Sequence, residues 1–487
     1  MLKLLSWRRL RSVGILAIAH FSEALLPFVR SVALAHLVAP TQFGIAMAIT
    51  TTAYVIELFT DLGLDRMAVR AAAAEDTLHY RDTLHAMNFL RGLLNGAVLM
   101  VLGPFLAALL GARESGLWFS SLGLICLLRG LTHFEIKQLM QRYIFWPEGT
   151  VILCLQISWT VTTIVLAWIL HDARSMAFGI IAGQVCYAAV SHILARSRWR
   201  LRWNRAVVRE ALAYGVPLIP SSILTAANGM LDRFLVGGVL GASTLGFYTA
   251  IVMMSGMPRS ILSRIMNNVA IPVFINQSEN KNQGRQAFDI WSVASIAASF
   301  VAAVAILIAA RPTLYLFYGP AFVPSPIVTV LIAVDFIPKF LICLVGTPAL
   351  ALGHTGALLR YTAVTLLGLV LATIGILVEP SLEGFLTGMV VGDIIALVWI
   401  VRGAIQHYPY RGVPMWSLLA GAFATFGGLA VVTVTWSGAS AIDPTTVFSH
   451  VAAAGVAVAL FAGLLIAVTG SRQFLGVGVL RRLRQRG

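Results

Sequence analysis

Four arginines lie inside apolar stretches of this sequence, where a charged side chain is costly. They are Arg30, Arg91, Arg129 and Arg233. A charge at the depth of a membrane span costs roughly 2.5 to 3.5 kcal/mol on insertion scales, so such side chains normally face a cavity or a partner. The arginines therefore predict a cationic ladder along a cavity. The alternative is that each is paired with an acid such as Asp232, Glu135 or Glu57.

Other polar residues share these apolar stretches. His20, Glu23 and Arg30 fall on one helical stripe, which we expect to face the same cavity. A single histidine on such a face is more often a hydrogen-bonded polar residue than a proton relay. Carboxylates at span depth can exchange a cation or serve contacts between helices. The candidates for ion coupling are Asp232, Asp393, Glu57 and Asp61, with Asp335 as a further one. The pattern does not choose between H⁺, Na⁺ and no ion.

Motifs of nucleotide, metal and covalent chemistry are missing from the sequence. None of the four lysines follows a glycine, so no phosphate-cradling P-loop is present. There is no D-x-D pair and no H-E-x-x-H motif. The four cysteines lack C-x-x-C spacing and are typical of small apolar residues. We therefore expect no metal site, no cofactor and no enzymatic activity.

Composition indicates the elements that position these residues. The chain has 487 residues, of which 59% are hydrophobic and 11% charged, and its mean hydropathy is +0.86. A soluble globule of this size needs far more polar surface. A spanning helix needs about 20 mostly apolar residues, and the sequence supplies about fourteen such windows. We predict an all-α, polytopic membrane protein.

The predicted spans divide the chain into two halves and a tail. They are 14–37, 43–62, 84–110, 115–136, 147–170, 175–195, 211–238, 243–272, 287–310, 322–343, 357–378, 382–402, 414–436 and 446–469. We predict an N-terminal six-helix lobe over 1–195 and a basic cytoplasmic linker over 196–210. A C-terminal six-helix lobe follows over 211–403, and two extra helices with a basic cytoplasmic tail occupy 404–487.

The distribution of cations predicts the orientation. The net charge is +15, from 35 Lys and Arg against 20 Asp and Glu. If the spans alternate and the N-terminus is cytoplasmic, most cations, Lys137 and Lys339 among them, fall on the inner side. Only Arg113, Arg174 and Arg311 fall on the outer side. This is the positive-inside pattern of a membrane protein rather than the basic surface of a nucleic-acid-binding protein.

An internal repeat suggests that the two halves are related. At an offset of 202 residues, HLVAPTQFGI (His36 to Ile45) aligns with GVLGASTLGF (Gly238 to Phe247), and Gly44 aligns with Gly246. The same offset places Arg30 over Asp232, which is followed by Arg233. Repeats in which two similar bundles face a central site are the usual plan of secondary transporters.

These stretches carry a resemblance to a known family. LDRFLVGGVLGASTLGFY, LAHLVAPTQFGI with FTDLGLDRMAVR, and more weakly ALALGHTGALLRY resemble bacterial polysaccharide and lipid-linked oligosaccharide flippases. This polysaccharide transport family belongs to the superfamily that also holds murein-precursor flippases and multidrug antiporters. One departure is His36, where the family more often carries Arg.

The resemblance implies a flippase in the bacterial cytoplasmic membrane, with both termini cytoplasmic. Its cargo would be a polyprenyl-diphosphate-linked oligosaccharide, whose compact anion suits paired arginine hydrogen bonds. Membrane lipids, a polysaccharide polymerase and export machinery are the expected partners, and nucleic acid is not. The alternatives are a multidrug or cation antiporter of the same superfamily, which four intramembrane arginines disfavour, and an outer-face glycan polymerase or ligase, which the short outer loops disfavour.

Overall fold

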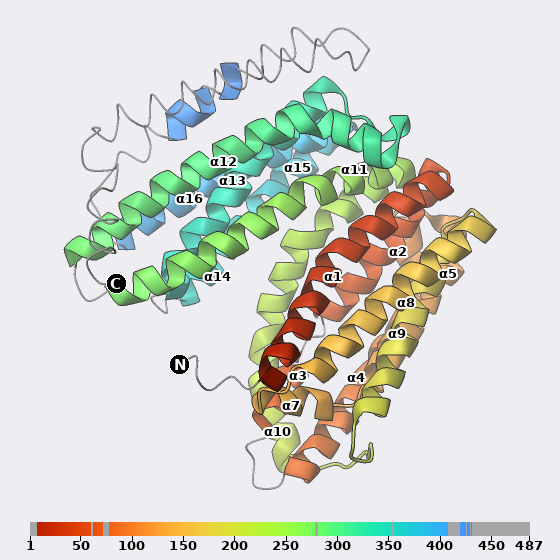
Figure 1. The fold of residues 1–487 in the computed structure, drawn as a ribbon. Helices are drawn as coiled ribbons and strands as arrows, with labels where there is room; N and C mark the ends of the chain where they lie inside the picture. Colours follow the sequence, from red (N-terminus) through yellow and green to blue (C-terminus); the bar gives the residue numbers. More distant parts are fainter. Residues whose placement is uncertain are drawn as a thin grey trace. The chain divides into compact units, whose positions relative to one another are not determined.

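The computed structural model describes residues 7–59, 62–71, 77–277, 281–351, 355–407, 419–424, 426–428 and 430 (Figure 1). Within these residues all regular secondary structure is helical. Nine of the described helices are long and apolar enough to cross a membrane, or ten if one bent pair is counted as a single span. The predicted all-α, polytopic fold is confirmed. The predicted span 446–469 lies outside the described residues, and only part of the span 414–436 is described, including the short apolar helix Leu419–Gly428.

The chain packs as two compact units, Met1–Met253 (unit 1) and Met254–Gly487 (unit 2). Their boundary falls inside α11 (Ile219–Gln277), which contains predicted spans seven and eight. Packing therefore groups span seven with the helices of the first half. The predicted division into an N-terminal lobe (1–195) and a C-terminal lobe (211–403), joined by the linker 196–210, follows the internal repeat rather than these packing units. It stays a prediction.

Unit 1 is a helical bundle. Its other helices are α1 (Trp7–Leu37), α2 (Pro40–Phe59), α3 (Leu64–Ala71), α4 (Thr77–Leu109), α5 (Gly116–Ser121), α6 (Gly123–Gly130), α7 (Glu135–Gln141), α8 (Trp146–Leu170), α9 (Arg174–Leu194) and α10 (Arg205–Gly215). Within this bundle α1 and α8 run in the same direction. Helix α8 packs between α1 and α9, and α4 packs on α5 and α6. The predicted fourth span is broken, because the helical segment Arg113–Gly130 meets α7 at 54°.

The described part of unit 2 contains the rest of α11, the short helical segment Leu419–Gly428 and five labelled helices. These are α12 (Lys281–Tyr318), α13 (Pro326–Ala351), α14 (Thr355–Val364), α15 (Leu366–Val378) and α16 (Leu382–His407). Helix α13 packs against α12 and α16, and α15 packs against α16. Glycine allows the closest of these approaches, since a Cβ on Gly388 would lie 2.2 Å from the Leu371 carbonyl oxygen.

The two glycine-containing segments that the repeat aligns are in contact within unit 1. Gly241 has φ 85°, which interrupts α11 and begins a new helix after it. Gly44, at the start of α2, lies against this turn so closely that a Cβ there would be 1.7 Å from the Ala242 carbonyl oxygen. A Cβ on Gly246 would be 2.9 Å from Gly44 Cα. The sequence pair Gly44 and Gly246 is therefore a direct backbone contact.

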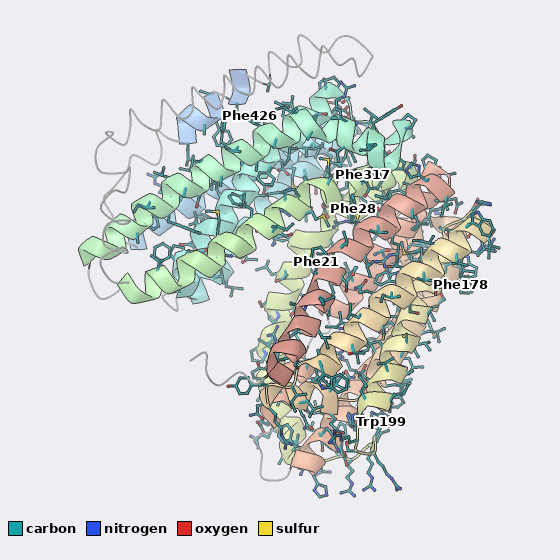
Figure 2. All side chains as sticks on the ribbon, viewed as in Figure 1. Phe21, Phe28, Phe178, Trp199, Phe317 and Phe426 are labelled. Atoms are coloured by element: carbon teal, nitrogen blue, oxygen red, sulfur yellow. The ribbon has the colours of Figure 1, made fainter. Side chains whose placement is uncertain are left out.

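The outer surface of unit 1 suits a bilayer. Large apolar side chains such as Phe21 of α1 and Phe178 of α9 are exposed (Figure 2). In water such exposure would be unfavourable, whereas lipid solvates it. Together with the apolar helices, this exposure describes a multi-pass membrane protein.

Candidate functional site

A glycine contact between α4 and α6 brings Arg91 and Arg129 close together. A Cβ on Gly92 would lie 2.5 Å from the Cys126 carbonyl oxygen and 2.9 Å from Gly130 Cα. Because only glycine permits this approach, the two helices touch immediately beside both arginines. Asn88 Nδ2 donates at 2.9 Å to the Arg129 carbonyl oxygen, where α6 ends. This hydrogen bond therefore fixes the position of the Arg129 backbone, from which its side chain extends.

Lys137 joins these arginines in what we call the basic cluster, with Asp65 and Glu148. Its Nζ donates to Glu148 Oε1 at 2.6 Å and lies 3.3 Å from Asp65 Oδ2. Asp65 also interacts electrostatically with Arg129 and Arg91. The cluster therefore draws side chains from α3, α4, α6, α7 and α8. Three cations face two carboxylates, which leaves one positive charge to attract an anion.

Asp65 is the accessible member of the cluster. Its side chain is 54% exposed, whereas Lys137 and Glu148 are 13% and 5% exposed. Enclosure by protein would by itself raise the pKa of the Asp65 carboxyl, but the cations Lys137, Arg129 and Arg91 lower it, and the pKa lies below its ordinary value. Asp65 therefore remains a carboxylate at neutral pH and balances part of the cluster's charge.

Asp65→Asn should change the pH dependence of stability. Since folding lowers the pKa of this carboxyl, its contribution is full above the unfolded value of about 4 and is lost as the pH falls further. When the pH is lowered below about 4, we expect the thermal midpoint of the wild-type protein to decrease more than that of Asp65→Asn. Thermal unfolding in detergent between neutral and acidic pH measures this, with Glu114→Gln, an exposed carboxylate, as the control. Equal slopes in wild type and Asp65→Asn would contradict the assignment.

Arg30 is bound elsewhere in unit 1. It is 2% exposed, its guanidinium lies 3.7 Å from the centre of the Trp159 ring, and Nη1 donates to Thr160 Oγ1 at 3.1 Å. Ser12 accepts hydrogen bonds from the backbone N–H groups of Phe145 and Trp146, so the start of α1 lies beside the start of α8. The residues from Ser12 to Arg30 cover roughly 27 Å of helix. Arg30 and Lys137 therefore lie toward opposite ends of the bundle.

The remaining residues predicted to line the cavity differ in exposure. His20 and Glu23 are exposed and hydrogen-bond each other on α1 at 2.7 Å, between His20 Nδ1 and Glu23 Oε2. Arg233 is held on its own helix, because Nη1 donates to the Gly229 carbonyl oxygen at 2.5 Å and lies 3.5 Å from Asp232 Oδ1. Arg233 therefore forms an ion pair with Asp232, the acidic partner that the sequence offered as an alternative.

The candidate ion-coupling residues fall into three situations. Asp232 Oδ2 accepts a 2.7 Å hydrogen bond from the Tyr248 hydroxyl, so this carboxylate joins the two parts of α11 that flank Gly241. Asp393 is buried in unit 2, within 3.5 Å of Lys339. Asp61 lies outside the described residues, as does the side chain of Glu57.

Lys339 corrects one part of the sequence interpretation. We assigned it to the inner loops, but it lies within α13, in the candidate span Pro326–Ala349, where it contacts Asp335 and Asp393. The spacing of Asp335 and Lys339, four residues apart on one helix face, is a signal that could have placed it in the span. Lys137, Asp65 and Glu148 were likewise not recognised as one site, because they are distant in sequence and come together only through packing.

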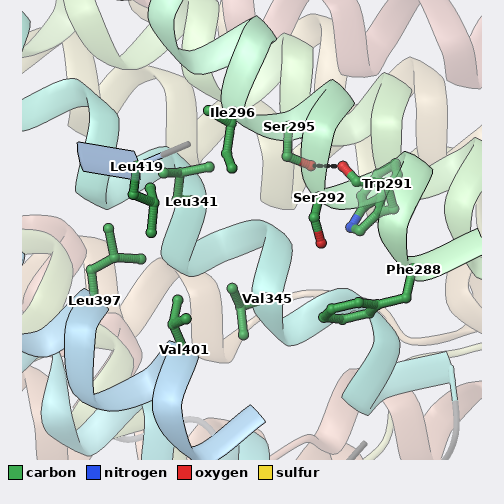
Figure 3. Close-up of a pocket in the computed structure, with 10 residues that line it drawn as sticks. All are labelled: Phe288, Trp291, Ser292, Ser295, Ile296, Leu341, Val345, Leu397, Val401 and Leu419. Atoms are coloured by element: carbon green, nitrogen blue, oxygen red, sulfur yellow. Dashed lines mark hydrogen bonds between the residues drawn. The ribbon is translucent and has the colours of Figure 1, made fainter. Parts of the chain in front are cut away.

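A pocket in unit 2, with about 380 Å³ of empty space that includes open solvent, has a different character. It lies between α12, α13, α16 and the helical segment that begins at Leu419 (Figure 3). Phe288, Leu341 and other apolar side chains line most of it. The Ser295 hydroxyl donates to the Trp291 carbonyl oxygen at 2.7 Å on the same helix. The residues that line it carry no charge, so this pocket does not suit a diphosphate.

Comparisons with known proteins agree with this architecture. The model of a family described as "Polysaccharide biosynthesis protein" matches residues 33–326. A Klebsiella pneumoniae protein, described as an uncharacterized membrane protein in cps region, is 21% identical over 321 residues, which are 65% of this chain. The match spans 65% of the length of that curated relative.

Two solved structures share the fold. The lipid II flippase MurJ, in an inward closed conformation, superposes with a TM-score of 0.70 at 12% identity, over 93% of this chain and 98% of that one. An inward-facing multidrug resistance transporter of the MATE family and MOP superfamily gives 0.59 at 13% identity, over 81% of this chain and 98% of that one. At such identities the likeness shows the fold alone. Because the family model matches more than half of the sequence, this chain belongs to the polysaccharide biosynthesis protein family of membrane proteins.

Proposed function

We propose that this chain is a flippase for a polyprenyl-diphosphate-linked oligosaccharide, the repeat unit of a surface polysaccharide. It moves the glycan from the inner to the outer face of the bacterial cytoplasmic membrane by alternating access. Both termini are cytoplasmic, and no covalent bond of the cargo changes. Membership of a polysaccharide biosynthesis family and a fold shared with a lipid II flippase support this proposal. Polysaccharide polymerase and export machinery are its proposed partners.

The basic cluster is the observation that carries the proposal. A diphosphate presents several anionic oxygens in a small volume, which suits two guanidinium groups and an ammonium held by neighbouring helices. Asp65 neutralises part of this charge when no cargo is bound, and its exposure lets phosphate oxygens replace it at Arg91 and Arg129. The polyprenyl tail stays in lipid, so only the head group requires a polar path. His20 and Glu23, which the sequence predicts to face the cavity and which are exposed on α1, are proposed sugar contacts.

A cation or drug antiporter is the second candidate, and the fold shared with a multidrug resistance transporter favours it. A cationic drug would require a site with net negative charge. The basic cluster has the opposite charge, since three cations face two carboxylates. The observed electrostatics therefore favour an anionic cargo.

Transport by the purified full-length chain in vesicles tests the choice. Polyprenyl-diphosphate oligosaccharide is placed in the lipid, and a membrane-impermeant glycosidase reports the fraction on the accessible face. We expect protein-dependent flipping of the diphosphate form, slower flipping of a monophosphate form, and no transport of ethidium. Ethidium transport without glycan flipping would establish the antiporter instead. Equal rates for monophosphate and diphosphate would contradict recognition of the diphosphate.

A further inference from the structure

Unit 2 contains a buried ionic group outside the basic cluster, which we call the aspartate–lysine trio. It consists of Asp335 and Lys339 on α13 and Asp393 on α16. Lys339 Nζ donates to Asp335 Oδ2 at 2.5 Å and lies 3.5 Å from Asp393 Oδ2. Asp335 and Asp393 are 8% and 3% exposed. Two buried carboxylates therefore share one ammonium group.

The trio lies near the middle of the span. Helices α13 and α16 begin side by side, since the Ser325 hydroxyl donates to Glu383 Oε1 at 3.2 Å. Asp335 follows Pro326 by nine residues and Asp393 follows Leu382 by eleven, which at helical rise is roughly 14 and 17 Å. The hydrocarbon core of a bilayer is about 30 Å thick. Both carboxylates are therefore about halfway across.

The helices around the trio make space for its carboxylates, but the other described titratable groups on them do not hydrogen-bond to these carboxylates. A Cβ on Gly368 of α15 would lie 2.3 Å from Asp393 Oδ1, so glycine makes the space that this carboxylate fills. Arg259 of α11 acts on Lys339 by charge repulsion. The other described titratable groups on the packed helices are Arg311, Tyr315, Tyr318, Arg360, Tyr361, Glu383 and Arg402. In the described part of the chain, none of these hydrogen-bonds to the trio.

Two carboxylate oxygens of the trio lack a donor. Asp335 Oδ1 and Asp393 Oδ2 are buried and accept no hydrogen bond in the described part of the chain, and the Lys339 ammonium group reaches Asp393 Oδ2 only as an ion pair at 3.5 Å. A buried acceptor without a donor costs about 1 to 3 kcal/mol, and more when it is charged. The two carboxyl groups are close enough to interact with each other. A single proton on one carboxyl would create an O–H donor to the other, and it would also remove one unit of like-charge repulsion.

We propose that Asp335 and Asp393 form a proton-binding site that holds one exchangeable proton at neutral pH, and that Lys339 occupies the place a sodium ion would take. Binding converts one carboxylate to a carboxylic acid, and release returns the proton to water. The ammonium group supplies a fixed positive charge between the carboxylates, so a metal cation gains little there. Coupling of this proton to glycan transport rests on the proposed function, whereas proton binding itself does not.

Infrared titration of the full-length protein tests the site. A protonated carboxylic acid has a carbonyl stretch distinct from the bands of a carboxylate. We expect one such band at neutral pH that disappears in Asp393→Asn and in Asp335→Asn. Asp232→Asn, which alters the aspartate paired with Arg233 in unit 1, should keep it. Thermal unfolding identifies variants that remain folded, and either trio variant suffices. Absence of the band in the wild-type protein would overturn the proposal.

Sodium provides the second measurement. Replacing choline chloride by sodium chloride at constant ionic strength should leave the wild-type band unchanged, and sodium-induced loss of the band would overturn the proposal. In Lys339→Met, we expect sodium to compete with the proton and weaken the band. Lys137→Met, which alters the buried lysine between two carboxylates of unit 1, should leave the band insensitive to sodium. A sodium-insensitive band in Lys339→Met would contradict the role of Lys339. A failed flipping assay with the band intact would contradict only the proposed function.

Discussion

Arg129→Ala is expected to slow flipping of polyprenyl-diphosphate oligosaccharide by roughly ten- to a hundredfold. The loss of charge-assisted hydrogen bonds to phosphate is worth about 1.5 to 3 kcal/mol, and about 1.4 kcal/mol corresponds to a factor of ten in rate. Arg91→Ala should act in the same direction, because both arginines surround Asp65. Arg129→Lys should recover only part of the rate, because an ammonium group lacks the planar pair of donors. The vesicle assay measures all three.

The matched control for these variants is Arg113→Ala. Arg113 is exposed at the opposite end of the segment Arg113–Gly130, away from the basic cluster. We expect the wild-type rate from this variant, with equal incorporation into vesicles. A wild-type rate in Arg129→Ala, or an equal loss in Arg113→Ala, would show that the basic cluster does not bind the phosphates.

Among glycine-to-alanine substitutions at the described glycines, Gly44→Ala is expected to have the largest effect on stability. The added carbon would lie 1.7 Å from the Ala242 carbonyl oxygen, which is backbone and cannot rotate away. Overpacking of a close contact usually costs 1 to 3 kcal/mol and occasionally more, and this overlap belongs at the upper end. We expect the thermal midpoint in detergent to fall by at least about 5 °C.

Gly14→Ala is the control for this substitution. Gly14 also lies in a helix of unit 1, but nothing is within 4 Å of where its Cβ would be. Alanine in an open helical position should stabilise by roughly 0.5 to 1 kcal/mol. Equal midpoints for Gly44→Ala and Gly14→Ala would show that α2 at Gly44 is not in tight contact with the turn at Gly241.

Hydropathy predicted most of the fold because a lipid environment restricts the choices. The first predicted span, 14–37, matches the candidate span Gly14–Leu37, and the predicted start at 382 matches α16. The predicted spans 211–238 and 243–272 imply a break between them, and the non-helical backbone of Gly241 confirms it. The break between α6 and α7 was missed, since an apolar window does not reveal a 54° bend.

The candidate site was less predictable from the sequence, because the partner of each charged side chain depends on which helices pack together. Intramembrane arginines were identified from sequence, but their partners depend on which helices touch. Arg30 hydrogen-bonds to Thr160, which is 130 residues away, and no local pattern indicates that pairing. The positive-inside rule assigns lysines near span ends to the inner loops. This rule is statistical, so an individual lysine can depart from it. Lys339 shows that a lysine can instead lie at mid-span when two carboxylates surround it.

The contact between Gly44 and the Ala242 carbonyl has a consequence for biogenesis. The nascent chain inserts the first helices long before residues 242–246 leave the ribosome, so Gly44 initially lacks its contacts with Ala242 and Gly246. Unit 1 can complete this contact only after the beginning of the second helix of the second repeat has been synthesised. Translation arrest between residues 196 and 240 would therefore leave an incomplete bundle that requires protection by insertion factors or is degraded.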